Sequence, residues 1–117
     1  MAKASLDLVR GTLDLLILKT LTWGPAHGYG ITSAIQNATN GALLVEEGAL
    51  YPALYRMEAK GWITASWGLS ENNRRAKYYE LTTEGRKHFH QEVKTWNAYI
   101  GAVGSLLSAP NPGVARA

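Results

Sequence analysis

Glu71-Asn72-Asn73-Arg74-Arg75-Ala76-Lys77-Tyr78-Tyr79-Glu80-Leu81-Thr82 is the stretch that decides the fold. Its pattern is that of the tip and return strand of a β-hairpin that leads into a helix. Asn72-Asn73 favours a turn, because asparagine tolerates a positive φ. From Lys77 to Leu81 the side chains alternate at the two-residue period of a strand. Three cations lie at or beside this turn, so the hairpin is suited to reach the backbone of a polyanion.

The composition narrows the classes of protein to which the chain can belong. Its 117 residues suit one domain with a modest core, which an oligomer interface would support. The net charge of +3 is mildly basic and does not by itself indicate a nucleic-acid partner, so the placement of the charges matters more. Cysteine is absent, which excludes disulfides and thiolate chemistry and fits a reducing, cytoplasmic location.

Neither end of the chain predicts a membrane segment. Residues 1–7 lack the apolar core of a signal peptide. The uncharged stretch from Thr95 to Ala115 is interrupted by polar residues, glycines and prolines. A spanning helix needs about 20 predominantly apolar residues, so we expect no membrane partner.

Three helices are predicted before the hairpin. Leucine and isoleucine recur at helical spacing over residues 12–22, and Trp23-Gly24-Pro25 ends that helix. A second helix is expected over residues 27–40, followed by a short β-prone piece at residues 43–45. The third helix is expected over residues 47–60, with one apolar face and one outward face that carries tyrosines and cations.

The hairpin and a long final helix complete the chain. The strands are predicted at residues 62–67 and 77–81, with a loop over residues 68–76. Thr82 or Thr83 can cap the final helix, which is predicted to continue to Ser108. Its apolar residues recur in steps of four, three, four, three and four, which is the heptad seam of a coiled coil. The predicted dimerisation residues are Phe89, Val93, Trp96, Ile100, Val103 and Leu107.

The predicted order is helix, helix, short strand, helix, hairpin, long helix. This is the order of a winged helix-turn-helix, so the fold class is mainly α with a small β-hairpin and a long C-terminal dimerisation helix. Residues 1–81 are the predicted DNA-binding domain, residues 82–108 the dimerisation helix and residues 109–117 a flexible tail.

The third helix and the wing together predict a DNA-binding face. A helix fits the major groove, and the wing cations are placed to contact phosphates. The alternative reading is an ordinary solvated helix face beside a solvated loop. The predicted DNA-binding residues are Glu47, Gly48, Tyr51, Pro52, Tyr55, Arg56, Lys60, Arg74, Arg75 and Lys77.

Five blocks of sequence resemble, in order, the motifs of PadR-family transcriptional regulators. They are Gly11–Leu18, Gly24–Gly30, Gly48–Leu54, Gly61–Ile63 and Arg75–Gly85. The resemblance covers about residues 6–90 and implies a homodimer that represses transcription, of the compact branch with one C-terminal helix. It also implies release from DNA by a small aromatic ligand in some members. Ala49 stands where the family often has Ser or Thr, so a hydroxyl contact is not carried over there.

Two roles remain open for Trp96. On the seam it is most simply part of a dimer core. Two copies across a two-fold axis could instead line a cleft for a flat apolar effector. The candidate ligand pocket is Leu15, Trp96, Tyr99 and Ile100.

No catalytic residue, metal site or cofactor is predicted. His27 lies at a helix start and is expected to cap it or to be hydrogen-bonded in another way, rather than to bind a ligand. Gly28-Tyr29-Gly30 lacks the third glycine of a dinucleotide loop. His88 and His90 diverge by about 200° on a helix and cannot share a metal within one chain. A protein-binding winged helix without DNA remains the main alternative, followed by a small-molecule sensor, and an enzyme is the weakest.

Overall fold

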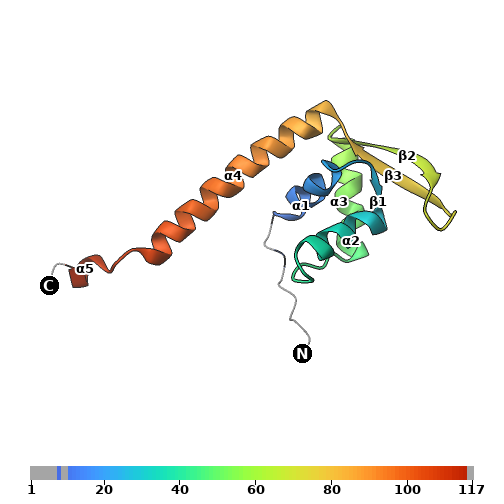
Figure 1. Ribbon diagram of the computed structural model, residues 1–117. Helices are drawn as coiled ribbons and strands as arrows, with labels where there is room; N and C mark the ends of the chain where they lie inside the picture. The colour runs from blue at the N-terminus through green and yellow to red at the C-terminus, as the bar shows by residue number, and fades with distance from the viewer. Residues whose placement is uncertain (1–7, 9–10, 116–117) are drawn as a thin grey trace.

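The computed structural model describes residue 8 and residues 11–115, and shows one small domain from which a long helix projects (Figure 1). Residues 1–7 and 9–10 of the expected DNA-binding domain and residues 116–117 of the expected tail lie outside the described residues. The fold class predicted from the sequence is confirmed. The elements are α1 (Leu13–Leu21), β1 (Ala26–His27), α2 (Gly28–Ala38), α3 (Glu47–Ala59), β2 (Ile63–Leu69), β3 (Arg75–Leu81), α4 (Thr83–Ser108) and α5 (Pro112–Ala115).

The sheet has three antiparallel strands in the order β1-β3-β2. The hairpin is longer than predicted, because β2 extends to Leu69 and β3 starts at Arg75, so the loop is Ser70–Arg74 rather than residues 68–76. The third strand was predicted at the wrong place. It is Ala26–His27, which pairs with Tyr79 and Tyr78 of β3, whereas residues 43–45 form no strand.

The core lies between α1, α2, α3 and the sheet. Ile17, Leu18, Ile31, Leu54 and Met57 are fully buried there. α1 is apolar around most of its surface and is correspondingly central, with α2, α3, β3 and α4 all packed against it. Val45 fills the same core from the loop before α3, which explains the apolar residues of that loop without a strand.

A tight joint sets the direction of α4. The Thr82 hydroxyl accepts a hydrogen bond from the Gly85 N–H (2.9 Å) and donates one to the Gly61 carbonyl (2.6 Å), which confirms Thr82 as the helix cap. The Thr82 N–H donates to the Trp62 carbonyl (3.1 Å). The ring of His88 stacks on Trp62 with the centroids 3.6 Å apart. These contacts fix α4 to the segment that connects α3 with the wing.

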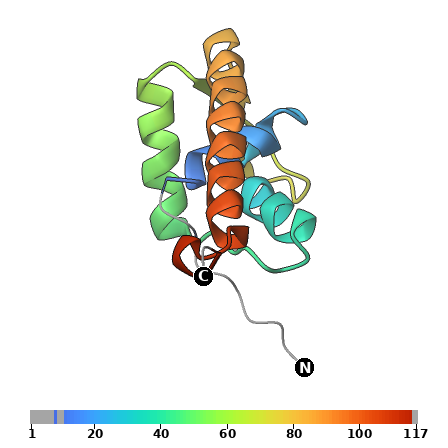
Figure 2. The same cartoon turned by 90° about the vertical axis from the view of Figure 1, so that its left-hand side faces the viewer.

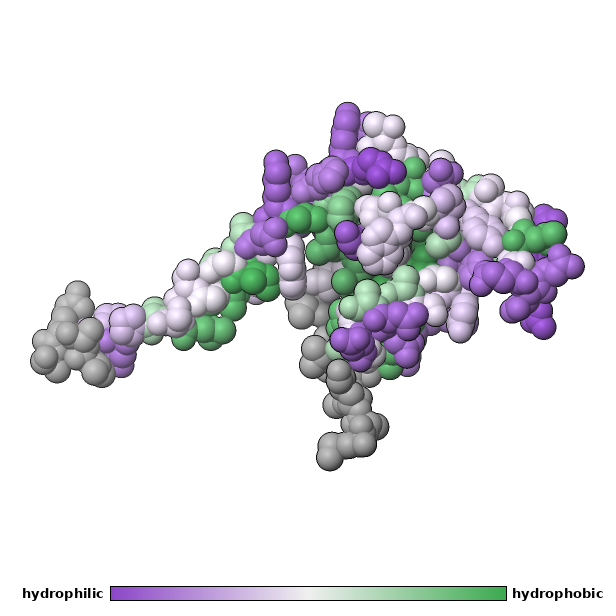
Figure 3. Space-filling view, viewed as in Figure 1, coloured by the Kyte–Doolittle hydropathy of each residue, from purple (hydrophilic) through white to green (hydrophobic). Residues whose placement is uncertain are grey.

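The heptad seam of α4 divides into two parts. Phe89 is buried in the core of its own chain, and Val93 packs against that core. Trp96 and Val103 are half-buried, while Ile100 is 47% and Leu107 80% exposed. The C-terminal half of α4 extends away from the domain (Figure 1), and Figure 2 looks at the domain with α4 in front of it. Hydrophobic residues lie along the lower edge of this half in Figure 3. Dimerisation through this half stays a prediction, whereas Phe89 is already used within the protomer.

The chain continues beyond α4 into a short helix, α5. Within the segment predicted to be a flexible tail, Pro112–Ala115 forms a single helical turn, α5. Among the residues that the structure describes, no helix has the length and apolar character needed to cross a membrane.

Candidate nucleic-acid interface

The outward face of α3 carries the side chains that were predicted to read DNA. Leu50, Ala53, Leu54 and Met57 face the core, so the helix presents its other side to solvent. On that side Tyr51 is 46% and Tyr55 78% exposed. Glu47, Gly48, Pro52, Arg56 and Lys60 are exposed as well.

Pro52 lies in the second turn of α3, one turn later than its first-turn placement in the sequence reading. Because proline has no N–H, it cannot donate to the carbonyl of Gly48 four residues earlier. Gly48 is exposed, and the space where its Cβ would stand is open. The N-terminal part of α3 can therefore approach another molecule closely with its backbone.

Two cations of this face have partners within the chain. The Arg56 guanidinium contacts the Asp14 carboxylate of α1 at 2.6 Å, a charge-assisted contact that ties α3 to α1. The ammonium of Lys60 lies 4.7 Å from the centre of the Trp62 ring. Arg56 is thus paired with Asp14 but remains half exposed, and its predicted contact with DNA stays a prediction.

The wing is a regular hairpin with a short tip. Asn73 has a positive φ of 60°, and the Ser70 N–H donates to the Arg74 carbonyl at 2.8 Å, which closes the turn. Arg74 is exposed at the tip. The asparagine turn chemistry predicted from the sequence therefore lies where the chain reverses.

Two further cations lie on the face of the wing that continues the core side of the sheet. The Arg75 guanidinium stacks 4.8 Å from the centre of the Trp67 ring. The Lys77 ammonium lies 3.7 Å from the Glu58 carboxylate of α3 and 5.8 Å from the centre of the Tyr79 ring.

Burial raises the pKa of the Tyr79 phenol, with smaller contributions from Tyr51 and Glu58, so this phenol stays neutral near pH 7.

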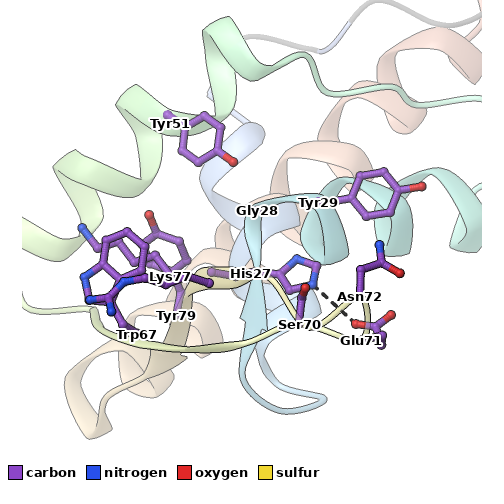
Figure 4. Close-up of a pocket in the computed structure, with 12 residues that line it drawn as sticks. His27, Gly28, Tyr29, Tyr51, Trp67, Ser70, Glu71, Asn72, Lys77 and Tyr79 are labelled. Atoms are coloured by element: carbon purple, nitrogen blue, oxygen red, sulfur yellow. Dashed lines mark ion pairs between the residues drawn. The ribbon is translucent and has the colours of Figure 1, made fainter.

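An open hollow of about 540 Å³ joins α3, the wing and the start of α2 (Figure 4). Of the predicted DNA-binding residues, it brings together Tyr51, Arg75 and Lys77. The other seven lie on the surface outside its lining. The residues that line the hollow are His27, Gly28, Tyr29, Tyr51, Trp67, Ser70, Glu71, Asn72, Arg75, Ala76, Lys77 and Tyr79.

Gly28 explains how Tyr51 reaches the hollow. A Cβ at Gly28 would lie 2.4 Å from the Tyr51 hydroxyl oxygen, so any other residue there would make the Tyr51 ring shift. The sequence reading had not assigned a site role to His27, Tyr29 or Trp67. Tyr29 is 77% and Trp67 59% exposed, and a large aromatic residue among polar neighbours is the signal that could have indicated them.

A second hollow, of about 360 Å³, lies between α1 and α4. It brings together Leu15, Trp96 and Tyr99 of the predicted ligand pocket, whereas Ile100 is not part of its lining. Glu92 is the charged residue in the lining, which also includes Gly11, Thr12 and Thr95. The walls are largely apolar and aromatic, which suits a flat organic molecule.

Residues 17–91, from α1 to the first part of α4, match the family model described as "Transcriptional regulator PadR-like family". The chain belongs to this family. The resemblance drawn from the sequence is therefore confirmed, and the function of the PadR-like family as a whole is DNA-binding regulation of transcription.

Relatives of known sequence support the same membership. The chain is 34% identical over 90 residues to "Uncharacterized protein X" of Lysinibacillus sphaericus, covering 77% of this chain and 83% of that protein. It is 33% identical over 112 residues to the transcriptional regulator YqjI of Escherichia coli K12. This match covers 92% of the chain but 52% of YqjI, so the chain spans about half of that relative.

Solved structures of PadR-like proteins have the same architecture. A transcriptional regulator from Clostridium thermocellum superposes with a TM-score of 0.75 at 32% identity, covering 82% of this chain and 93% of that one. A PadR family regulator from Eggerthella lenta gives a TM-score of 0.74 at 30% identity, covering 86% of both chains. These matches support the PadR-like arrangement of the domain and wing.

Proposed function

We propose that this chain is a homodimeric transcriptional repressor that binds double-stranded DNA at an inverted-repeat operator. The observation that carries the proposal is the convergence of Tyr51 from α3 with Arg75 and Lys77 from the wing on one hollow. Major and minor grooves are separated by one sugar-phosphate strand. With α3 in the major groove and the wing over the neighbouring minor groove, that strand would pass between them, where these side chains lie.

The symmetry of a dimer sets the form of the operator. A two-fold axis relates two copies of α3, which would enter major grooves one or two DNA turns apart, each of about 34 Å. The bound dimer would then block access to a promoter by occupying it. In this proposal the protein works in the cytoplasm and needs no cofactor.

The wing and α3 are expected to contribute differently to binding. Replacing Arg75 with alanine should weaken binding to every duplex by about tenfold and flatten the log-log salt slope by about 2, one phosphate contact per protomer. Replacing Tyr51 with alanine should instead change the preference between operator and unrelated duplex. Fluorescence anisotropy with labelled duplexes across a salt series measures both quantities.

Lys87→Ala is the matched control, because Lys87 is an exposed cation of α4 that pairs with Glu84. It should leave affinity and slope unchanged. If the unmodified protein forms no complex with any duplex at low salt, the DNA proposal is wrong and a protein-binding winged helix becomes the better reading.

We further propose that a small planar aromatic effector binds in the hollow between α1 and α4. Trp96 and Tyr99 supply flat aromatic walls there, and Leu15 supplies an apolar one. A ligand between these helices would change the angle of α4 to the domain. That change would alter the spacing of the two α3 helices in a dimer and release the DNA.

Tryptophan fluorescence tests the effector proposal. Titration with planar aromatic compounds is expected to quench emission in the unmodified protein, and Trp96→Phe should abolish most of that quenching. The other three tryptophans, Trp23, Trp62 and Trp67, lie outside this hollow and remain as an internal reference. Emission that stays constant throughout a broad panel of such compounds would argue against an effector at this site.

A further inference from the structure

His27 has one donor whose direction is set before any ligand binds. Its Nδ1 accepts a hydrogen bond from the Gly30 N–H at 3.0 Å, which confirms the capping role expected from the sequence. In the neutral ring the proton must then sit on Nε2. The ring packs edge-on against Tyr78 at 5.2 Å and stacks with Tyr29 at 6.4 Å, and the side chain is only 16% exposed. Nε2–H is therefore a donor of fixed direction, and His27 lines both the hollow of about 540 Å³ and a smaller one of about 240 Å³ that it shares with Glu71, Tyr29 and Tyr78.

The group opposite this donor comes from the tip of the wing. A carboxylate oxygen of Glu71 lies 3.6 Å from Nε2 of His27, and the two are joined by the dashed line in Figure 4. The Glu71 side chain is 89% exposed, so little packing holds it there. A contact of this length to an exposed carboxylate contributes little stability and can separate at small cost.

The surroundings of Glu71 favour a different anion. Arg75 and Lys77 line the same hollow, while Glu71 is the single carboxylate among its lining residues. A carboxylate and a phosphodiester are both anionic oxygen acceptors for an imidazole N–H. A DNA strand that enters the hollow would bring a phosphate toward the cations and toward Glu71. The phosphate and the Glu71 carboxylate repel each other, so both cannot stand at the Nε2–H donor of His27.

We propose that His27 Nε2 is a phosphate-binding donor for DNA and that Glu71 occupies its position as an internal competitor in the free protein. The inference rests on the proposed DNA-binding function and adds a residue-level regulation of it. When DNA binds, a phosphate oxygen accepts a hydrogen bond from Nε2–H and the wing-tip carboxylate moves out into solvent. Because phosphates carry no sequence information, Glu71 lowers the affinity for all duplexes alike and limits retention on unrelated DNA.

Glu71→Gln tests the competitor. It removes the charge on an exposed turn without disturbing the fold, and is expected to tighten binding to operator and unrelated duplex alike by about three- to tenfold at about 0.1 M salt. Glu80→Gln is the matched control, since Glu80 is an exposed carboxylate on the same wing but does not line the hollow. It should change affinity by less than about twofold.

His27→Asn tests the donor. Asparagine is a good N-cap, so α2 should keep its start while the reach of Nε2 is lost. Binding is expected to weaken by about tenfold for each protomer, which loses one hydrogen bond to a charged group. In the double variant the gain from Glu71→Gln should disappear, because the competition requires the donor. Thermal melting by circular dichroism checks that each variant is folded.

The possible outcomes distinguish a failure of this inference from a failure of the proposed DNA-binding function. If Arg75→Ala weakens binding but Glu71→Gln leaves it unchanged or weakens it, the wing tip is braced by Glu71 and the competitor role is overturned while DNA binding stands. If Glu71→Gln and Glu80→Gln tighten binding equally, the effect is one of net charge and the inference is overturned as well. If the unmodified protein binds no duplex, both proposals fail.

Discussion

Replacing Ile100 and Leu107 together with aspartate is expected to convert the protein into a monomer. These residues are 47% and 80% exposed on the half of α4 that projects from the domain. They lie seven residues apart, so both face the same side of the helix, where a second copy would cover them. Four carboxylates placed in such a dimer seam would each lose solvation without a partner, at a cost of several kcal/mol.

Sedimentation velocity would measure the change in mass directly. Operator affinity should fall on the order of 100-fold or more, because the second half-site is then no longer tethered to the first. The matched control is Ala98→Asp with Ser105→Asp, which adds the same charge on the opposite side of α4. The control should remain dimeric, and a dimer that survives the Ile100 and Leu107 changes would refute the proposed seam.

Local signals in the sequence were sufficient for the long helices and the turn. α3 was predicted at residues 47–60 and is Glu47–Ala59, and α4 ends at Ser108 as predicted. Periodicity and capping depend on neighbours in the chain, so these elements can be recognised without the fold. The same holds for the asparagine turn, where Asn73 has the positive φ that its side chain tolerates.

The short strand could not be predicted from local sequence. Ala26–His27 becomes a strand only because it pairs with Tyr79 and Tyr78, about 50 residues later in the chain. Residues 43–45 have higher β propensity but form no strand in the described sheet. Strand propensity reports how well a side chain fits a sheet surface, and it does not show which strand will be available as a partner.

The sequence predicted which residues belong to the candidate site, but the contacts among them could be described only from the folded structure. Outward-facing positions of α3 follow from its period, but the pair formed by Arg56 and Asp14 joins residues 42 apart in sequence. The heptad rule likewise identifies the apolar face of α4 but not which part of it is buried within the chain. Phe89 packs in its own domain, whereas Leu107 is left exposed on the same seam.

The second prediction with a large expected effect concerns Gly85 of α4, which lies against the backbone of Trp62 just before the wing. A Cβ at Gly85 would lie 1.8 Å from the carbonyl oxygen of Trp62, and that oxygen belongs to the backbone and cannot rotate away. The same carbonyl accepts the hydrogen bond of the Thr82 N–H that starts α4. Gly85→Ala is therefore expected to destabilise the protein by about 3 kcal/mol or more, because backbone at the joint must shift and the cap is strained.

The expected change has the opposite sign to that of helix propensity alone. Gly85 lies in the first turn of α4, and replacing a helical glycine with alanine ordinarily stabilises by up to about 1 kcal/mol. Gly48→Ala is the matched control, because a Cβ at Gly48 would meet nothing within 4 Å. Thermal unfolding should show a midpoint lowered by about 10 °C or more for Gly85→Ala and unchanged or raised for Gly48→Ala. Equal midpoints for the two variants would mean that α4 does not press against Trp62, and the angle between α4 and the rest of the domain would then not be fixed by this joint.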